Sequence, residues 1–282
     1  MKIPSKTRLF LDGLRTNNSN RPLFLNEDGE INAKWQNLIL SSVFQPIYNS
    51  RDFSTPYAYE AFVRCIDLYD NQIKPGDLFS KLADKDEIIS LDRLCRTIHL
   101  LNFTLYSADD ALLFLNVHEG LISAVDDNHG SSFRKVVDAL GFSPNRIVIE
   151  LPISLVKDTK RLHFVLQNYR LNSLEVAINI DSIEDIQGLS ERANIHYIKI
   201  ARSFLGTGSD LEKDLDLIAQ SSNQANIIIT KNVDKASLLP DQKIFLQGNA
   251  YGESAAFTKE TLATSPQLSS PPQERICLHI GG

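Results

Sequence analysis

The sequence contains a series of eight short β-rich runs, most of them separated by longer segments with helical periodicity and charge. The runs are Val43–Asn49, Tyr57–Arg64, Leu112–Val117, Ile147–Leu151, Glu175–Ile180, His196–Ala201, Asn226–Thr230 and Lys243–Gln247. Several of them, such as Ile227-Ile228-Ile229, are continuously apolar, which is typical of strands covered on both faces in a largely parallel sheet. Eight strands that alternate with helices predict an α/β fold of the (β/α)8 TIM-like barrel type rather than an open, doubly wound sheet.

The first two runs depart from this alternation. The connection from Asn49 to Pro56 is too short for a helical crossover, so these two strands are expected to pair as an antiparallel hairpin. We therefore predict a modified barrel with an antiparallel first strand. The expected outer helices are Pro75–Tyr106, Ser131–Leu140, Pro152–Tyr169, Asp210–Ser221 and Val233–Leu239.

The two ends of the chain lie outside the eight repeats. We predict an N-terminal extension over residues 1–35, a barrel domain over residues 36–262 and a Pro/Ser-rich tail over residues 263–282. A small helix at Trp35–Leu40 is expected to open the barrel. Ser265–Gln273 reads as an extended linker, and Arg275–Ile280 as either a docking strand or part of a disordered tail.

Composition limits the class of protein. A chain of 282 residues with 43% hydrophobic content can bury one substantial core. The formal net charge of -6 argues against direct binding of nucleic acid, which needs clustered Lys and Arg. Three cysteines without a Cys-x-x-Cys pair are typical of reduced thiols, and no run of apolar residues has membrane-spanning length. We expect a cytoplasmic protein without a membrane segment.

Polar residues close the predicted strands. In β/α barrels the carboxyl ends of the strands meet at one mouth, where active sites are built. The residues at these positions are Glu60, Asn116, Glu150, Asn179 followed by Asp181, Lys199, Lys231 and Gln247. Glu60 and Glu150 each interrupt an apolar run, and a buried carboxylate needs either a metal ion or a cationic partner. The alternative to a metal site is a structural ion pair with Arg64 or Lys199.

Six motifs give these positions a family resemblance. They are Phe44-Gln45-Pro46-Ile47, Tyr59-Glu60-Ala61-Phe62-Val63-Arg64, Phe114-Leu115-Asn116-Val117, Ile147-Val148-Ile149-Glu150-Leu151, Tyr197-Ile198-Lys199-Ile200 and Leu246-Gln247-Gly248. In their order and approximate spacing they resemble the successive motifs of EAL domains, from near residue 36 to near residue 260. The resemblance implies a barrel with an antiparallel first strand that hydrolyses cyclic di-GMP with two divalent cations, Mg²⁺ or Mn²⁺.

The departures from the family pattern fall where its chemistry lies. Glu60, Asn116, Glu150, Lys199 and Gln247 match family positions. The family's Asp-Asp pair falls on Ile178 and Asn179, the Asp of its Lys-Ile-Asp motif is Ala201, and a Glu of strand seven is Lys231. A Lys in place of a ligand puts one cation where another should bind, a repulsion of about 4 kcal/mol at 4 Å and an effective dielectric of 20. We therefore expect no metal, and Lys231 as a built-in counterion for Glu60 or Glu150.

The nucleotide-binding positions are better preserved. Gln45 and Arg64 match residues that help to hold the dinucleotide in the family, and Phe62 stands where the family motif has Leu. An Arg fork suits a phosphodiester because it donates two parallel charged hydrogen bonds. The alternative is that Arg64 pairs with a structural carboxylate such as Asp92.

Two functions follow from the resemblance. The first is a catalytically inactive EAL-like regulator that acts by binding a protein partner, with or without cyclic di-GMP as its signal. The second is an active phosphodiesterase in which Asp181, Glu184 or Asp185 replaces the missing acidic pair. An unrelated barrel enzyme lacks support, because no Gly-rich phosphate loop and no recognisable nucleophile turn occur in the sequence.

Overall fold

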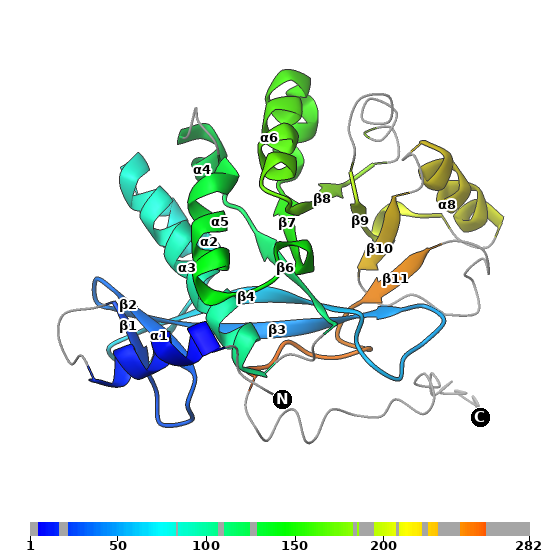
Figure 1. Cartoon of the computed structure of the whole chain (residues 1–282). Coiled ribbons are helices and arrows are strands. Elements are labelled where there is room, and N and C mark those ends of the chain that lie inside the picture. The colour runs from blue at the N-terminus through cyan, green and yellow to red at the C-terminus, as the bar shows by residue number, and fades with distance from the viewer. Residues whose placement is uncertain are drawn as a thin grey trace, which may run out of the picture.

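Eight strands close into a ring, as the alternating pattern predicts. The computed structural model describes residues 5–16, 22–82, 84–106, 110–124, 129–182, 185, 195–206, 209–221, 225–230 and 243–257. The ring consists of β3 (Leu38–Asn49), β4 (Ala58–Asp67), β6 (Leu112–Asn116), β7 (Ile147–Leu151), β8 (Glu175–Ile180), β9 (Tyr197–Ala201), β10 (Asn226–Thr230) and β11 (Ile244–Gln247). β11 pairs with β3 and closes the ring (Figure 1).

One strand of the ring runs against the others. β3 is antiparallel to both neighbours, β4 and β11, whereas every other pair in the ring is parallel. The short connection between β3 and β4 holds the two strands in a hairpin of ten paired positions, Leu38–Ile47 with Ala58–Asp67. The predicted antiparallel first strand is confirmed.

Alternate residues of each strand face the inside of the ring. The inward side chains form a compact apolar layer: Ile47, Ala58, Phe114, Val148, Ala177, Tyr197, Ile228 and Phe245. Their neighbours in sequence, for example Ile147 and Ile149, face outward and join the larger core beneath the helices. Because the period of a strand is two, the inward residue nearer the mouth comes two positions after the apolar one in the parallel strands and two positions before it in the antiparallel β3.

Helices cover the outside of the ring (Figure 1). They are α1 (Ser5–Thr16), α2 (Pro75–Ser80), α3 (Lys85–Tyr106), α4 (Glu119–Ala124), α5 (His129–Leu140), α6 (Thr159–Leu171) and α8 (Ser209–Ser221), with 3-10 turns η1 (Pro144–Arg146), η2 (Ile153–Lys157) and η3 (Arg202–Phe204). The described part of the chain contains no helix that is both long and apolar enough to cross a membrane.

Two of the predicted helices are divided in the structure. Pro75–Tyr106 forms α2 and α3, because the Asp84 side chain accepts the backbone N–H of Asp86 and starts a new helix. Pro152–Tyr169 becomes η2 followed by α6, whose first turn is capped by Asp158 through the N–H of Arg161. The predicted elements Val233–Leu239, Ser265–Gln273 and Arg275–Ile280 lie outside the described residues.

The prediction of a helix at Trp35–Leu40 is wrong. β2 (Ile31–Trp35) ends there, Gln36 and Asn37 form a tight turn, and β3 begins at Leu38. Gln36 has a φ of 52°, a left-handed conformation that a helix does not accept. The hairpin instead pairs Trp35 with Leu38 and Ala33 with Leu40.

An arm of strands extends past the mouth of the ring. β6 pairs only with Ala58–Ala61 of β4, so the rest of β4 projects beyond the barrel together with the first half of β3. β2 joins the arm through β3, β1 (Leu23–Leu25) joins through β2, and β5 (Gln72–Ile73) pairs with β4. The predicted boundary at residue 35 therefore falls between two paired strands, and the domain limits stay a prediction.

A buried polar cluster ties this arm to α3. The Asn102 side chain accepts the N–H of Ile31 and donates to its carbonyl, both at 2.8 Å. Asn102 also donates to Ser42 Oγ, which lies 2.8 Å from His99 Nδ1. Burial alone lowers the pKa of His99 to about 3. The neutral imidazole is thus part of the packing between helix and strands.

Candidate functional site

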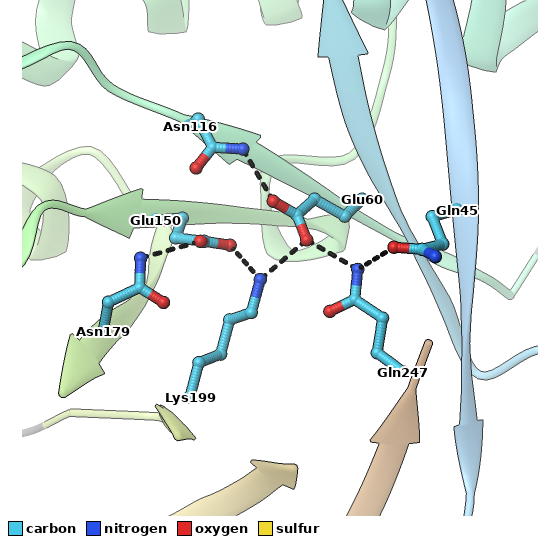
Figure 2. A network of polar contacts seen from close by, with 7 residues as sticks. All are labelled: Gln45, Glu60, Asn116, Glu150, Asn179, Lys199 and Gln247. Carbon is cyan, nitrogen blue, oxygen red and sulfur yellow. Dashed lines mark hydrogen bonds and ion pairs between the residues drawn. The ribbon is translucent and has the colours of Figure 1, made fainter. Parts of the chain in front are cut away.

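Seven polar side chains meet at the mouth of the barrel (Figure 2). They are Gln45 on β3, Glu60 on β4, Asn116 on β6, Glu150 on β7, Asn179 on β8, Lys199 on β9 and Gln247 on β11. Six of them follow an inward apolar residue by two positions, and Gln45, on the antiparallel β3, precedes the inward Ile47 by two; each therefore lies one layer above the apolar interior. The structure thus brings together six of the predicted strand-end positions: Glu60, Asn116, Glu150, Asn179, Lys199 and Gln247.

Lys199 lies between the two glutamates. Its Nζ is 2.7 Å from Glu60 Oε2 and 2.6 Å from Glu150 Oε2. All three residues are 4% exposed, so one ammonium and two carboxylates share a site with little water. The alternative of a structural ion pair with Lys199 is the geometry observed.

Side-chain amides also donate hydrogen bonds to the two carboxylates. Asn116 donates to Glu60 Oε1 at 2.8 Å, and Asn179 donates to Glu150 Oε1 at 2.8 Å. Gln247 donates to Glu60 Oε2 at 2.6 Å and also reaches Gln45 Oε1 at 3.2 Å. Every carboxylate oxygen of the pair therefore accepts at least one hydrogen bond from a side-chain N–H.

The two glutamates differ in their hydrogen-bond donors, and so in their pKa. Burial raises the pKa of Glu60, but the charge of Lys199 and the hydrogen bonds from Lys199, Asn116 and Gln247 together lower it below its ordinary value. Glu150 has fewer donors; burial and the nearby charge of Glu60 raise its pKa despite Lys199 and Asn179. Burial opposes the charge of Lys199, but the two carboxylates raise its pKa. Lys199 stays protonated, and Glu150 is the carboxylate that takes up a proton first.

The two positions of the family's acidic pair point to opposite sides of β8. Asn179 faces the mouth, whereas Ile178 faces outward and is fully buried beneath the helices. Ala201 lies on the same face of β9 as Lys199 and brings no oxygen to the mouth. Lys231 lies outside the described residues, so its predicted role as counterion stays a prediction. Lys199 makes the contacts with Glu60 and Glu150 that were predicted for Lys231.

The residues present do not fit a pair of divalent cations. Such a site needs several anionic oxygens that hold two metal ions about 3.5–4 Å apart. Among the described residues, the mouth offers the carboxylates of Glu60 and Glu150, and an ammonium lies between them. Within the described ranges, no group of three or more His, Cys, Asp or Glu side chains is placed to hold a metal ion. Any metal ion bound between Glu60 and Glu150 would have to displace Lys199.

The candidate nucleotide residues form a strip along the arm. Phe62 and Arg64 follow Glu60 at alternate positions of β4 and so share its face, and Gln45 lies opposite Glu60 on β3. Phe62 is partly exposed and Arg64 is exposed. The strip therefore leads from the buried floor of the mouth into solvent.

Arg64 is not paired with Asp92. Its guanidinium donates to Ser254 Oγ at 3.1 Å. Asp92 instead forms a buried ion pair with Arg96 at 2.6 Å and accepts the N–H of His118. This ion pair was not predicted, although the spacing of four residues on one helix is a signal for it.

A segment after β11 contacts the candidate nucleotide residues, and sequence reasoning did not find it. Gln45 donates to Asn249 Oδ1 at 3.1 Å and to the carbonyl of Gly252 at 3.3 Å, and Ser254 accepts from Arg64. A Cβ atom at Gly252 would come within 2.4 Å of Pro46 Cγ, so the close approach requires glycine. In the sequence, Gly252 was the one sign that this segment packs closely against another part of the chain.

Solved structures share this architecture. The EAL enzyme Bd1971 in its cAMP- and cyclic-di-GMP-bound form aligns over 80% of this chain with a TM-score of 0.62 and 15% identity. The aligned part spans 65% of the Bd1971 chain. The chain has the fold of EAL domains.

Two further structures are similar to this EAL-fold barrel. The EAL domain of Pseudomonas aeruginosa FimX bound to c-di-GMP matches at 17% identity and TM-score 0.60, over 77% of this chain and 91% of its own. Bacillus subtilis YkuI, in complex with c-di-GMP and calcium, matches at 18% identity and TM-score 0.61, over 80% of this chain and 60% of its own. No protein-family model matches the sequence, and no curated protein is significantly similar to it.

Proposed function

We propose that this EAL-fold barrel is a non-catalytic regulator that acts by binding a protein partner, with cyclic di-GMP as its candidate signal. One observation carries the first half of the proposal: the Lys199 ammonium lies between Glu60 and Glu150 where a metal ion would be needed. Among the described residues, the two carboxylates already bind this ammonium, and no further anionic side chain is placed there to hold two metal ions that would lower the pKa of an attacking water.

The open strip above this floor supports a nucleotide ligand. Arg64 is exposed and suited to a phosphodiester, and the partly exposed Phe62 ring offers a surface on which a base can stack. In addition, the buried Oε1 of Gln247 has no hydrogen-bond partner among the described residues. A ligand N–H or a water molecule can satisfy this acceptor. The similar structures of Bd1971, FimX and YkuI contain cyclic di-GMP, which makes it the first ligand to test.

The competing function is a phosphodiesterase with a rearranged metal site. It needs Asp181, Glu184 or Asp185 to replace the missing acidic pair. Asp181 is exposed beyond the end of β8, the N–H of Asp185 donates to Ser182 Oγ at 3.2 Å, and Glu184 lies outside the described residues. The described carboxylates make no contact with the mouth that favours this function.

One experiment separates the two functions. The purified chain is incubated with cyclic di-GMP and Mg²⁺ or Mn²⁺, and the linear dinucleotide is measured by chromatography. We expect none to accumulate. Steady production that disappears in Glu60→Ala would establish the phosphodiesterase instead.

A second measurement tests the signal. Calorimetric titration of cyclic di-GMP in EDTA is expected to give heat of binding, because Arg64 and Phe62 need no metal. If neither heat nor a thermal shift appears at high micromolar ligand, cyclic di-GMP is not the signal. The protein partner would then have to bind the outer helices without it, and capture from lysate would be the next step.

A further inference from the structure

The turn between β4 and β5 holds two large apolar side chains in solvent. Tyr69 is 86% exposed, the highest value among the large hydrophobic residues that the structure describes, and its neighbour Leu68 is 70% exposed. Single exposed apolar residues are ordinary on a protein surface, whereas adjacent ones on a turn are a common composition for a binding surface. The five residues Asp67–Asn71 are called the arm turn, because they end the arm of strands beyond the barrel mouth.

Hydrogen bonds hold the arm turn in one conformation. The Asp67 carboxylate accepts the backbone N–H groups of Tyr69 at 2.8 Å and of Asn71 at 2.9 Å, and the side-chain N–H of Asn71 at 3.0 Å. The backbone N–H of Asp70 also donates to the Asp67 carbonyl at 3.2 Å. Asp70 has a φ of 61°, a left-handed conformation that Asp tolerates in turns. The backbone that carries Leu68 and Tyr69 is therefore ordered before any partner arrives.

An ordered turn is suited to binding because less conformational freedom is lost in the complex. The ordering of loops and side chains opposes association, and a backbone that is fixed in advance removes part of this cost. Tyr offers a large contact area with only two side-chain torsions, and it is enriched among the residues that dominate the binding energy of protein interfaces. Leu68 and Tyr69 thus have the properties of an anchor that enters a pocket on another protein.

The charge of the arm turn limits the kind of molecule that it fits. Its five residues include two acids, Asp67 and Asp70, and no base. Hydrogen bonds, first from the Asn71 side chain and then from two backbone N–H groups, lower the pKa of Asp67 below its ordinary value, so the carboxylate is ionised at neutral pH. The nearest bases along the chain, Arg64 and Lys74, each lie three residues outside the turn.

The position of the arm turn leaves the barrel mouth free. β4 ends at Asp67, seven positions after Glu60 and three after Arg64, so the turn lies at the outer end of the strand that carries the candidate nucleotide residues. Lys34, an exposed base on β2 of the same arm, lies 5.5 Å from the centroid of the Phe24 ring and forms a cation–π contact with it. A partner at the turn therefore meets acidic and apolar groups first.

We propose that the arm turn is the docking element for the protein partner, with Leu68 and Tyr69 in an apolar pocket of that protein and Lys or Arg residues at the rim of the pocket opposite Asp67 and Asp70. This inference rests on the proposed function, because it states how the regulator holds its partner. Nucleic acid and anionic lipid surfaces do not fit the turn, since their phosphates repel its carboxylates. A protein surface with a basic rim attracts them.

Photo-crosslinking from the arm turn captures the partner. The photoreactive residue p-benzoyl-phenylalanine replaces Tyr69 in the full chain, expressed in its native cells, and replaces Leu9 of α1, which is 72% exposed, in a control chain. Irradiation should give one discrete adduct with a different protein from position 69 and none of the same mass from position 9. The proposal is overturned if position 69 gives no adduct, gives only an adduct with a second copy of the chain, or gives the same adducts as position 9.

The affinity of the purified, captured protein decides whether the anchor holds it. Leu68→Ser/Tyr69→Ser should raise the Kd more than about tenfold, whereas Leu9→Ser, the matched control, should leave it within about twofold. Asp70→Lys should also raise the Kd, and added salt should weaken binding of the unaltered chain. Circular dichroism and thermal melting check that each variant is folded. An equal Kd for the unaltered chain and the double Ser variant contradicts the proposal.

Failure of this inference is distinguishable from failure of the proposed function. Steady hydrolysis of cyclic di-GMP would contradict a non-catalytic regulator, whatever the crosslinks contain. A partner that binds the double Ser variant as tightly as it binds the unaltered chain would leave the regulator in place and remove only the arm turn as its docking element.

Discussion

The ammonium nitrogen of Lys199 lies 2.6 Å from Glu150 Oε2, and each side chain is only 4% exposed. A buried pair of this kind is an uncertain source of net stability, because both groups lost their hydration on folding. Once both groups are buried, however, each is needed to compensate the charge of the other.

Lys199→Met should destabilise the fold strongly. The substitution leaves Glu60 and Glu150 facing each other without a counterion, and losing one partner of a buried pair costs about 3–5 kcal/mol. Urea denaturation measures the change. Lys199→Met/Glu150→Gln should recover part of the loss, since one uncompensated charge is gone. As a control, Lys213→Met alters an exposed pair with Asp210 and should produce no measurable change.

Manganese should distinguish the natural mouth from a variant without the lysine. We expect Mn²⁺ to leave the melting temperature of the unaltered chain unchanged, because Lys199 occupies the space between the carboxylates. In Lys199→Ala the oxygens of Glu60, Glu150 and Asn116 become available, and Mn²⁺ should raise the melting temperature. The rise should vanish in Lys199→Ala/Glu60→Gln. Equal stabilisation of the unaltered chain would show that the mouth accepts a metal ion as it is.

The free energy of unfolding should decrease as the pH falls below neutral, because His99 becomes protonated in the unfolded chain. Its pKa is about 3 in the folded protein against 6.5 ordinarily, so the unfolded chain binds a proton that the folded chain does not. A depressed pKa gives stability that is present above pH 6.5 and lost as the pH falls, by about 1.4 kcal/mol per unit once well below 6.5. Unfolding free energies from pH 7 to pH 5 measure the slope. His99→Asn removes the titrating ring and should flatten it; identical slopes would assign the loss to other groups.

Arg64→Ala should weaken binding of cyclic di-GMP if the strip on the arm holds the phosphodiester. The expected loss is about 1.5–3 kcal/mol, the usual contribution of a charged hydrogen bond. Arg51→Ala, an exposed arginine in the connection between β3 and β4, is the matched control. Titration calorimetry in EDTA compares the two. Equal affinities would remove Arg64 from the binding site.

The fold was largely predictable because strand pattern and topology depend on local sequence. Runs such as Ile147–Leu151 are strands with the predicted bounds, and the short link after Asn49 forces the antiparallel pair. The helix expected at Trp35–Leu40 was wrong because the left-handed residue of the tight turn is Gln36, so no Gly marks the turn in the sequence. The division of Pro75–Tyr106 depends on a single capping residue, Asp84.

The site was predictable as a set of positions but not as a set of contacts. Alternation along a strand shows which residues face the mouth, so Glu60, Asn116 and Glu150 could be placed together. Which cation they meet depends on side-chain reach across the barrel. Lys199, Arg64 and Lys231 were all candidate cations on sequence grounds, and Lys199 is the one that spans the distance from β9 to both glutamates.

The pairing of β3 with β11 has a consequence for synthesis on the ribosome. Gln45 and Gln247 meet across this last seam, 202 positions apart in the chain. At a translation rate of about 5–20 residues per second, roughly 10–40 s separate their emergence. During that interval β3 has its hairpin partner β4 but an open edge where β11 will lie, and Glu60 lacks the Gln247 donor. The nascent chain therefore exposes an unpaired strand edge until β11 is made, and this is the period when a chaperone or a fast translation rate should matter most for its yield.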